Sequence, residues 1–451
     1  MAQATEVATQ RQADLYLFRQ SYSLLVVAYF CFMKKAWFLL LLWLPIASIA
    51  QNKKGLYQGM WRAQLHRQDS QLVVFNFESI KIKGKWQFRI RNDKERIEVK
   101  KVIVTNDSVN FDMPTFESSF RTKIQSDGSL KGVWLKGTAL QTQRWIFTAI
   151  PNQPIRFDAV QGKHKNNVTG RWAVTITRAN GGTRPAVAEF LQKDDYLSGT
   201  FLTPSGDYRF LEGTVSGNLF RLSVFDGAHA YSFVARIDSD QQISNGIFYS
   251  GFNGRETWTA YKDASAKVPD VGNTPLLKEG EDRLHFSFKD VDRKIVSSDD
   301  ERFKNKVVII QLMGSWCPNC LDETKFLNEY YIKNKQRGVE VLALGYEYST
   351  DFERSRIGLE KFRNLYNVKY PMLVTGVWLN DSLRTEKTLP QITPIKVFPT
   401  TIFIGKDGKV KKIEVGFYGP GTGIHHETYK KQFYATVEEL LMEKEGAPIV
   451  E

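Results

Sequence analysis

The feature that most constrains the fold of this chain is a pair of cysteines separated by two residues. The pair lies in the motif Trp316-Cys317-Pro318-Asn319-Cys320, which follows the apolar run from Val307 to Met313. This order predicts a buried strand that delivers two thiols to the first turn of a helix. Unpaired N–H groups and partial positive charge at a helix start stabilise a thiolate. The sequence therefore predicts a reactive dithiol with Cys317 as the attacking thiol.

Two alternatives for the cysteine pair stay open at the level of sequence, namely half of a zinc site and a structural disulfide. Structural zinc takes about four N or S ligands at motif spacing, and the sequence has no second cysteine pair or Cys/His cluster. We therefore expect neither metal nor cofactor. The third cysteine, Cys31, lies near the N-terminus. If that segment is removed, one thiol pair remains, which favours redox chemistry over a scaffold role.

The N-terminal residues have the parts of a secretory signal peptide, displaced from the first residue. Lys34 and Lys35 precede an apolar core and the small residues Ser48 and Ala50. We interpret residues 33–50 as a signal peptide cleaved after Ala50, and residues 1–32 as an upstream extension. The alternative is that the segment from Ser23 to Ala50 is an uncleaved anchor. Lys34 and Lys35 interrupt this segment, and neither of its two halves reaches the roughly 20 apolar residues that span a bilayer. The protein is expected to be exported, with membrane contact only through this segment.

The net charge of +13 invites a nucleic-acid interpretation, which the pattern of charges disfavours. Between Lys81 and Lys101, Trp86, Phe88 and Ile90 alternate with charged or polar residues. Such alternation is typical of a strand with one buried and one solvated face. We expect no nucleic-acid partner.

Residues 55–262 are predicted to form two tandem all-β units, residues 55–155 and 156–262. Three short motifs of the first unit recur in the second at one constant interval: Gly59-Met60-Trp61 as Gly170-Arg171-Trp172, Val104-Thr105-Asn106 as Val215-Ser216-Gly217, and Phe147-Thr148-Ala149 as Trp258-Thr259-Ala260. Short alternating runs with turn residues between them favour small barrels or curled sheets. The Gly-x-Trp openings resemble those of lipocalin-like barrels. Residues 263–282, rich in Pro, Gly and charge, are predicted to be a linker that separates these units from a self-contained third domain.

Residues 283–446 show alternating strand and helix patterns, which predict an α/β domain. Expected elements are a strand pair near residues 285–296, the strand 307–313, a helix opened at Cys317, a strand at 339–344, a helix at about 351–366 capped by Ser349 or Thr350, a short strand at 372–374, a hairpin at 401–415, and a last helix at about 427–443.

This C-terminal region resembles a thioredoxin fold, and specifically the exported disulfide reductases of the TlpA type. The resemblance rests on Trp316-Cys317-x-x-Cys320 after a strand, on Glu323, and on Phe398-Pro399-Thr400-Thr401 at the start of another strand. It implies a cis Pro399 that packs against the dithiol and offers backbone to an extended substrate. The implied substrate-binding residues are Trp316, Pro318, Phe398, Pro399 and Thr400. It also implies protein disulfide substrates, a membrane thiol electron donor, a periplasmic or cell-envelope location in a bacterium, and a role such as cytochrome c maturation.

Glu323 is the candidate base for Cys320. Gln311 occupies the position where thioredoxins of the cytosol carry a buried aspartate, and an amide cannot take a proton. Glu323 lies at i+3 from Cys320, on the same helix face. The alternative is an exposed first-turn carboxylate favoured by the helix dipole.

Three segments depart from the family pattern. An insertion at residues 377–395 is expected to overhang the site. The run from Gly419 to Gly423 is interpreted as a flexible loop, since it lacks the residues of a phosphate loop. The adjacent His425 and His426 point to different helix faces and are a poor metal site.

These observations predict an exported thiol–disulfide oxidoreductase. Cys317 attacks a substrate disulfide, and Cys320, deprotonated through Glu323, releases the reduced product. Two rival hypotheses are a binding protein whose β units carry the function, and a peroxidase on the same fold. Because the predicted linker separates the domains, the β units are expected to be dispensable for dithiol chemistry.

Overall fold

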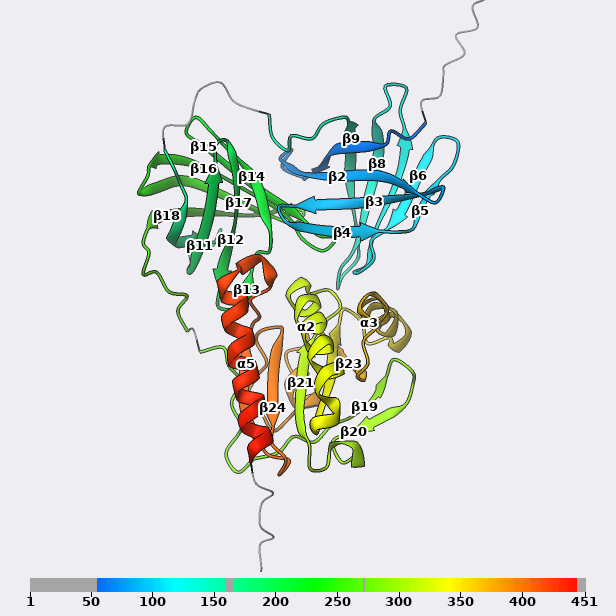
Figure 1. The fold of residues 1–451 in the computed structure, drawn as a ribbon, viewed down its shortest axis with the longest axis vertical. Helices are drawn as coiled ribbons and strands as arrows, with labels where there is room; N and C mark the ends of the chain where they lie inside the picture. The colour runs from blue at the N-terminus through cyan, green and yellow to red at the C-terminus, as the bar shows by residue number, and fades with distance from the viewer. Residues whose placement is uncertain (1–54, 159–165, 271, 444–451) are drawn as a thin grey trace, which may run out of the picture. The chain divides into compact units, whose positions relative to one another are not determined.

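The computed structural model describes residues 55–158, 166–270 and 272–443, which form three sheets and the helices packed on the third (Figure 1). The predicted signal peptide, the upstream extension and Cys31 lie outside the described residues. Among the residues described, no helix is both long and apolar enough to span a membrane.

The first sheet contains nine antiparallel strands in the order β4-β3-β2-β1-β9-β8-β7-β6-β5. Its strands are β1 (Gly59–His66), β2 (Leu72–Ile82), β3 (Lys85–Asn92), β4 (Glu95–Val99), β5 (Val102–Val104), β6 (Ser108–Asp112), β7 (Ser118–Ile124), β8 (Leu130–Gly137) and β9 (Thr142–Pro151). Along β1, Trp61, Ala63 and Leu65 are fully buried and alternate with partly exposed residues. This period of two places one face of the sheet on the core.

The second sheet also has nine antiparallel strands, in the order β11-β10-β18-β17-β16-β15-β14-β12-β13. Its strands are β10 (Gly170–Thr177), β11 (Thr183–Lys193), β12 (Tyr196–Thr203), β13 (Gly206–Asp207), β14 (Leu211–Ser216), β15 (Leu219–Phe225), β16 (Ala230–Ser239), β17 (Gln242–Ser250) and β18 (Gly254–Lys262). An additional pairing joins β11, at one end, to β12, which lies next to the two-residue strand β13 at the other end, so this sheet closes into a barrel.

Tryptophans anchor the opening strand of both sheets. Trp61 Nε1 donates a hydrogen bond of 2.9 Å to Ser79 Oγ, and Trp172 Nε1 donates one of 2.8 Å to the Val168 carbonyl. Stacked and edge-on aromatic rings fill both interiors, as in the parallel rings of Phe201 and Phe233 at 4.3 Å. These aromatic cores account for the all-β architecture of residues 59–262. The lipocalin likeness and the internal repeat stay predictions.

The third sheet has the order β20-β19-β23-β22-β21-β24-β25, with β21, β22 and β23 parallel. Its strands are β19 (Ser287–Asp290), β20 (Ile295–Ser297), β21 (Val307–Met313), β22 (Val339–Glu347), β23 (Met372–Trp378), β24 (Thr400–Ile404) and β25 (Val410–Val415). The α-helices are α2 (Pro318–Asn334), α3 (Phe352–Tyr366), α4 (Arg384–Thr388) and α5 (Ile424–Met442), and the 3₁₀ turns are η1 (Glu301–Phe303), η2 (Lys335–Arg337) and η3 (Pro420–Thr422).

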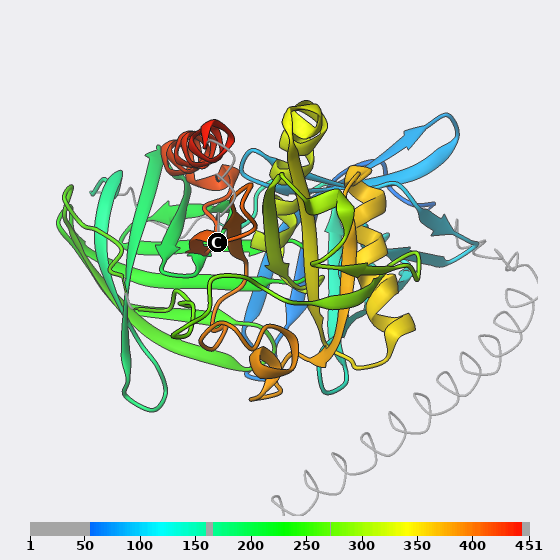
Figure 2. The same cartoon turned by 90° about the horizontal axis from the view of Figure 1, so that it is seen from below.

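Strand β21 is buried on both faces and divides the core of this domain. Val307, Ile309 and Met313 pack with residues of α2, α3 and α5, while Val308 and Ile310 face the opposite side. Figure 2 shows α2 and α5 on one side of the strands and α4 on the other. A mixed sheet covered on both faces around a central strand is the predicted α/β arrangement.

The structure corrects several predicted boundaries. Asp351, rather than Ser349 or Thr350, caps α3, because its carboxylate accepts from Arg354 N at 2.7 Å. Helix α5 begins at Ile424, one turn earlier than predicted. The predicted linker is in contact with its neighbours, since Ala266 packs against the second sheet and Leu277 pairs with Ile392 in the third domain.

Candidate functional site

The dithiol lies at the N-terminus of α2. Cys317 is the N-cap residue, and its Sγ accepts a hydrogen bond of 3.2 Å from Cys320 N. The two residues form a disulfide with a Cα–Cα distance of 5.2 Å. Cys317 retains 6% exposure and Cys320 none. The more accessible sulfur is thus the one held by the helix N-terminus, which is the arrangement that makes a cysteine nucleophilic.

Trp316 and the loop before β24 form the walls beside the dithiol. The Phe398–Pro399 bond is cis, and Cys317 Sγ lies 3.9 Å from the Phe398 carbonyl oxygen. Trp316 Nε1 donates a hydrogen bond of 2.8 Å to the Tyr346 carbonyl, and its ring meets the Phe398 ring at 5.7 Å. The structure therefore brings together Trp316, Phe398 and Pro399 as predicted.

The side chains of Thr400 and Pro318, two of the predicted substrate-binding residues, face the interior. Thr400 is fully buried and donates to the Val397 carbonyl at 2.8 Å, so its side chain faces the core. The side chain of Pro318 is also buried. Any contact of these two residues with a substrate would therefore run through their backbone, and their assignment stays a prediction.

Glu323 is completely buried, which rules out the alternative of an exposed first-turn carboxylate. It accepts hydrogen bonds from Gln311 Nε2 at 2.8 Å, Thr401 Oγ1 at 2.6 Å and Tyr429 at 3.1 Å. Burial raises the pKa of Glu323 to about 7, and the three hydrogen bonds oppose that rise. A carboxyl group that titrates near neutral pH can both take and return a proton.

Gln311 connects Glu323 to the dithiol. The amide that donates to Glu323 also donates to the Cys320 carbonyl at 3.1 Å. Its carbonyl end accepts from Thr324 Oγ1 at 3.0 Å, which fixes the orientation of the amide. The sequence marked Gln311 only as a residue unable to accept a proton, and the structure makes it a hydrogen-bonded bridge.

Glu347 is a second buried carboxylate beside the dithiol that sequence reasoning missed. It accepts from Ser315 N at 2.8 Å and from Ser315 Oγ at 2.6 Å. Burial raises the pKa of Glu347 to about 7. By holding Ser315, this carboxylate fixes the turn that leads into Trp316.

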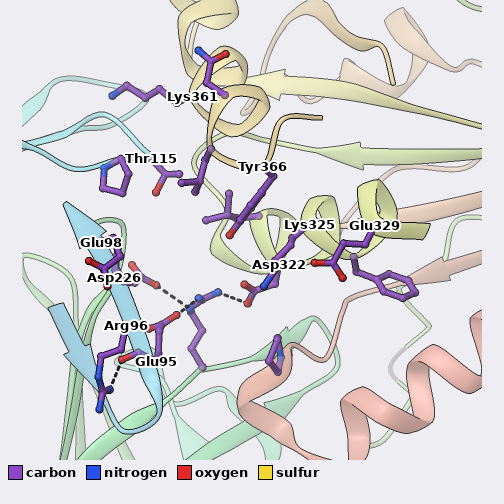
Figure 3. A pocket seen from close by; sticks show the side chains of 18 of the residues that line it. Glu95, Arg96, Glu98, Thr115, Asp226, Asp322, Lys325, Glu329, Lys361 and Tyr366 are labelled. Carbon is purple, nitrogen blue, oxygen red and sulfur yellow. Dashed lines mark hydrogen bonds and ion pairs between the residues drawn. The ribbon is translucent and has the colours of Figure 1, made fainter. Parts of the chain in front are cut away.

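A third missed group surrounds Arg209, which comes from the second sheet. Its guanidinium pairs with Glu95 of the first sheet and with Asp322 of α2, and it lies 3.5 Å from Asp226 Oδ2. Figure 3 shows Glu95, Asp226 and Asp322 turned toward one centre. Burial raises the pKa of Asp322 to about 7 despite the nearby arginine. No sequence pattern marks this cluster, because its members come from separate domains.

The remaining predicted features are structural. The insertion buries Leu389, Ile392 and Ile395 in the core on the face opposite α2, and therefore packs on the domain rather than overhanging the dithiol. The loop expected to be flexible is fastened, because Gly419 N donates to Asp207 Oδ2 at 2.7 Å.

The two histidines point to separate partners. His425 Nε2 lies 2.9 Å from Glu189 Oε1, and His426 Nδ1 lies 2.8 Å from the Tyr418 carbonyl oxygen. In the part of the chain that the structure describes, no three His, Cys, Asp or Glu side chains are grouped to hold a metal ion.

Comparison with known proteins assigns the dithiol domain to a family. The redoxin family model matches residues 264–430. The thiol-disulfide oxidoreductase ResA of Bacillus thuringiensis subsp. konkukian is 30% identical over 134 residues, which are 30% of this chain and 68% of that protein. The chain belongs to the family of ResA thiol-disulfide oxidoreductases.

Other members of the ResA family match the same region. ResA of Bacillus subtilis (strain 168) is 27% identical over 140 residues, which are 31% of this chain and 69% of that protein. A crystal structure of a putative thiol:disulfide interchange protein DsbE from Chlorobium tepidum covers 36% of this chain and 99% of its own at 20% identity, with a TM-score of 0.28. As a ResA-family chain, the protein is a thiol–disulfide oxidoreductase.

Proposed function

We propose that this chain is an exported disulfide reductase that acts on protein disulfides through Cys317 and Cys320. The observation that carries the proposal is an N-cap cysteine that keeps 6% exposure, with a fully buried second cysteine three residues on. Cys317, as thiolate, attacks one sulfur of the substrate disulfide and expels the other as a thiolate. Cys320 then attacks Cys317 in the mixed disulfide, which releases the reduced substrate and leaves the Cys317–Cys320 disulfide.

Glu323 is proposed as the group that accepts the Cys320 proton during resolution. Its burial, its pKa of about 7 and the Gln311 bridge to the Cys320 backbone support this role. The extended substrate would lie beside the Phe398–Pro399 backbone, near Trp316. A membrane thiol donor would supply two electrons to return the oxidised pair to the dithiol, and the expected location is the periplasm or cell envelope of a bacterium.

A test of this proposal compares the reduced protein with its Cys317→Ser variant in dithiothreitol-driven reduction of insulin. Wild type should accelerate reduction and the variant should not, while Cys320→Ser should accumulate the mixed disulfide. The equilibrium of the pair against a glutathione buffer then gives the redox direction. Faster reaction with hydrogen peroxide than with insulin or oxidised glutathione would favour the rival hypothesis that the chain is a peroxidase.

A further inference from the structure

Residues 206–209 of the second sheet lie directly on the turn between the two cysteines. Asn319 Nδ2 is 3.4 Å from the Asp207 carbonyl oxygen, and Arg209 Nη1 donates to the Pro318 carbonyl at 3.2 Å. A Cβ placed on Gly206 would stand only 2.0 Å from Asn319 Nδ2. This proximity leaves no space for a substrate backbone over Asn319.

Hydrogen bonds and ion pairs hold residues 206–209 in place. Asp207 Oδ2 accepts from Gly419 N, and its other carboxylate oxygen accepts from Arg209 N at 2.6 Å. Arg209 is 5% exposed and has three carboxylates around it, from β4, from the loop after β15 and from α2, where Asp322 lies one turn inside the helix. Because the guanidinium is almost fully desolvated, its removal would leave buried carboxylates unpaired, which costs more than the loss of a surface ion pair.

The opposite flank of the dithiol is covered by two other loops. Phe116 from the first sheet and Ala228 from the second belong to the same buried cluster as Cys317. The Phe116 carbonyl accepts from Lys361 Nζ, and Glu117 forms a two-pronged pair with Arg354 of α3 at 3.0 and 2.8 Å. We use the term cover for three segments: residues 206–209, the loop 113–117 between β6 and β7, and the loop 226–229 between β15 and β16. Under the cover, Cys317 is 6% exposed and Asn319 8%.

We propose that the cover determines the specificity of the dithiol, with Arg209 as the residue that holds it in place. A polypeptide disulfide must reach Cys317 along the Phe398–Pro399 loop, so the cover has to lift first. A small disulfide or thiol reagent needs a much smaller opening. Only the molecules whose cover is open can react with a protein substrate, so the observed rate is reduced in proportion to that open fraction. This inference rests on the proposed function, and it replaces the expectation that the β units are dispensable.

The test uses the full-length reduced chain, with Cys31→Ser and Cys320→Ala so that only Cys317 reacts. The rate of labelling is measured with N-ethylmaleimide and with a maleimide that carries a polyethylene glycol chain. Arg209→Ala should raise the ratio of bulky to small labelling about tenfold or more, since it leaves three buried carboxylates without their arginine. Arg209→Lys should give a labelling ratio between those of wild type and Arg209→Ala, because an ammonium lacks the planar fork of a guanidinium.

Arg156→Ala is the matched control. Arg156 is equally buried and donates to the Ser223 carbonyl at 2.9 Å, but makes no contact with α2 in the described structure. It should leave the labelling ratio unchanged. A ratio that is the same in wild type, Arg209→Ala and Arg156→Ala, with all three folded, would overturn the proposal.

A second pair of variants keeps the proposal testable if Arg209→Ala does not fold. Gly206→Ala sets a methyl group against Asn319, while Gly181→Ala adds one at another positive φ with nothing within 4 Å. Only Gly206→Ala should raise the ratio. Reduction of oxidised glutathione separates the two proposals, and for this measurement the same cover variants keep Cys320, because a protein with Cys317 alone stops at the mixed disulfide. Failure to reduce oxidised glutathione contradicts the proposed function, whereas equal labelling of wild type by both reagents contradicts the cover.

Discussion

The side-chain amide of Gln311 donates a hydrogen bond of 2.8 Å to the Glu323 carboxylate. The same nitrogen donates to the Cys320 carbonyl, so one amide connects the buried acid to the backbone of the resolving cysteine. Protonation of Glu323 is therefore expected to influence resolution rather than the first attack.

Glu323→Gln should leave attack by Cys317 intact and slow the release of the mixed disulfide by about 10²-fold or more, the usual effect of removing a positioned acid–base group. Stopped-flow trapping of the mixed disulfide measures both steps. Glu329→Gln, on an exposed position of the same helix, serves as the control. Equal resolution rates in wild type and Glu323→Gln would assign Glu323 a structural role only.

The pH dependence of stability should carry the signature of Glu323. Its pKa rises on folding from 4.5 to about 7, so between these values the folded chain holds a proton that the unfolded chain has lost. Stability from this group is complete below about pH 4.5 and is lost as the pH rises toward 7. Relative to wild type, Glu323→Gln should gain about 3 kcal/mol between pH 4.5 and pH 8. Urea unfolding across this range measures the gain, and parallel curves would refute it.

Alkylation of the reduced protein at neutral pH should modify Cys317 before Cys320. The N-cap position favours the Cys317 thiolate, and Cys320 has no exposed surface. Peptide mapping after brief exposure to iodoacetamide identifies the labelled residue. First labelling of Cys320 would reverse the assigned roles.

Ser315→Ala should destabilise the oxidised protein by about 1–3 kcal/mol, because Glu347 loses one of its two hydrogen bonds in a buried site. Chemical denaturation is the measurement. The exposed Ser382→Ala should change stability by less than about 0.5 kcal/mol. An equal effect of the two substitutions would show that Glu347 does not depend on the Ser315 hydroxyl.

Export should remove the chain up to about Ala50, because the apolar core is short and small residues follow it. N-terminal sequencing of protein from the cell envelope tests this directly. A mature chain that begins near Met1 would favour an anchor and would retain Cys31.

The sequence predicted the parts of the site that depend on local pattern. Cys317 was placed at a helix start by the preceding apolar strand, and Glu323 was found by its spacing from Cys320. The cap of α3 was misassigned because Ser349, Thr350 and Asp351 are three successive residues that can all cap a helix. Local pattern does not distinguish among them.

Features that join distant segments could not be predicted in the same way. Arg209 contacts the dithiol turn because segments far apart in the sequence fold against one another there, and nothing around Arg209 in the sequence marks it. The packing of the insertion could not be read from its sequence either, since only the tertiary structure shows that Leu389, Ile392 and Ile395 fill the core. Burial by tertiary contacts decided both cases.

The closure of only one of the two β sheets affects how each resists self-association. The second sheet joins β11 to β12, while the first ends at β4 and β5. An unpaired edge can recruit another chain by backbone hydrogen bonding, and charged side chains along it discourage such pairing. β4 reads Glu-Arg-Ile-Glu-Val, with three charges in five residues. Two of these charges already have partners within the chain, Glu95 in Arg209 and Glu98 in Arg89, so β4 is held by contacts of its own chain, whereas the second sheet is protected by closure.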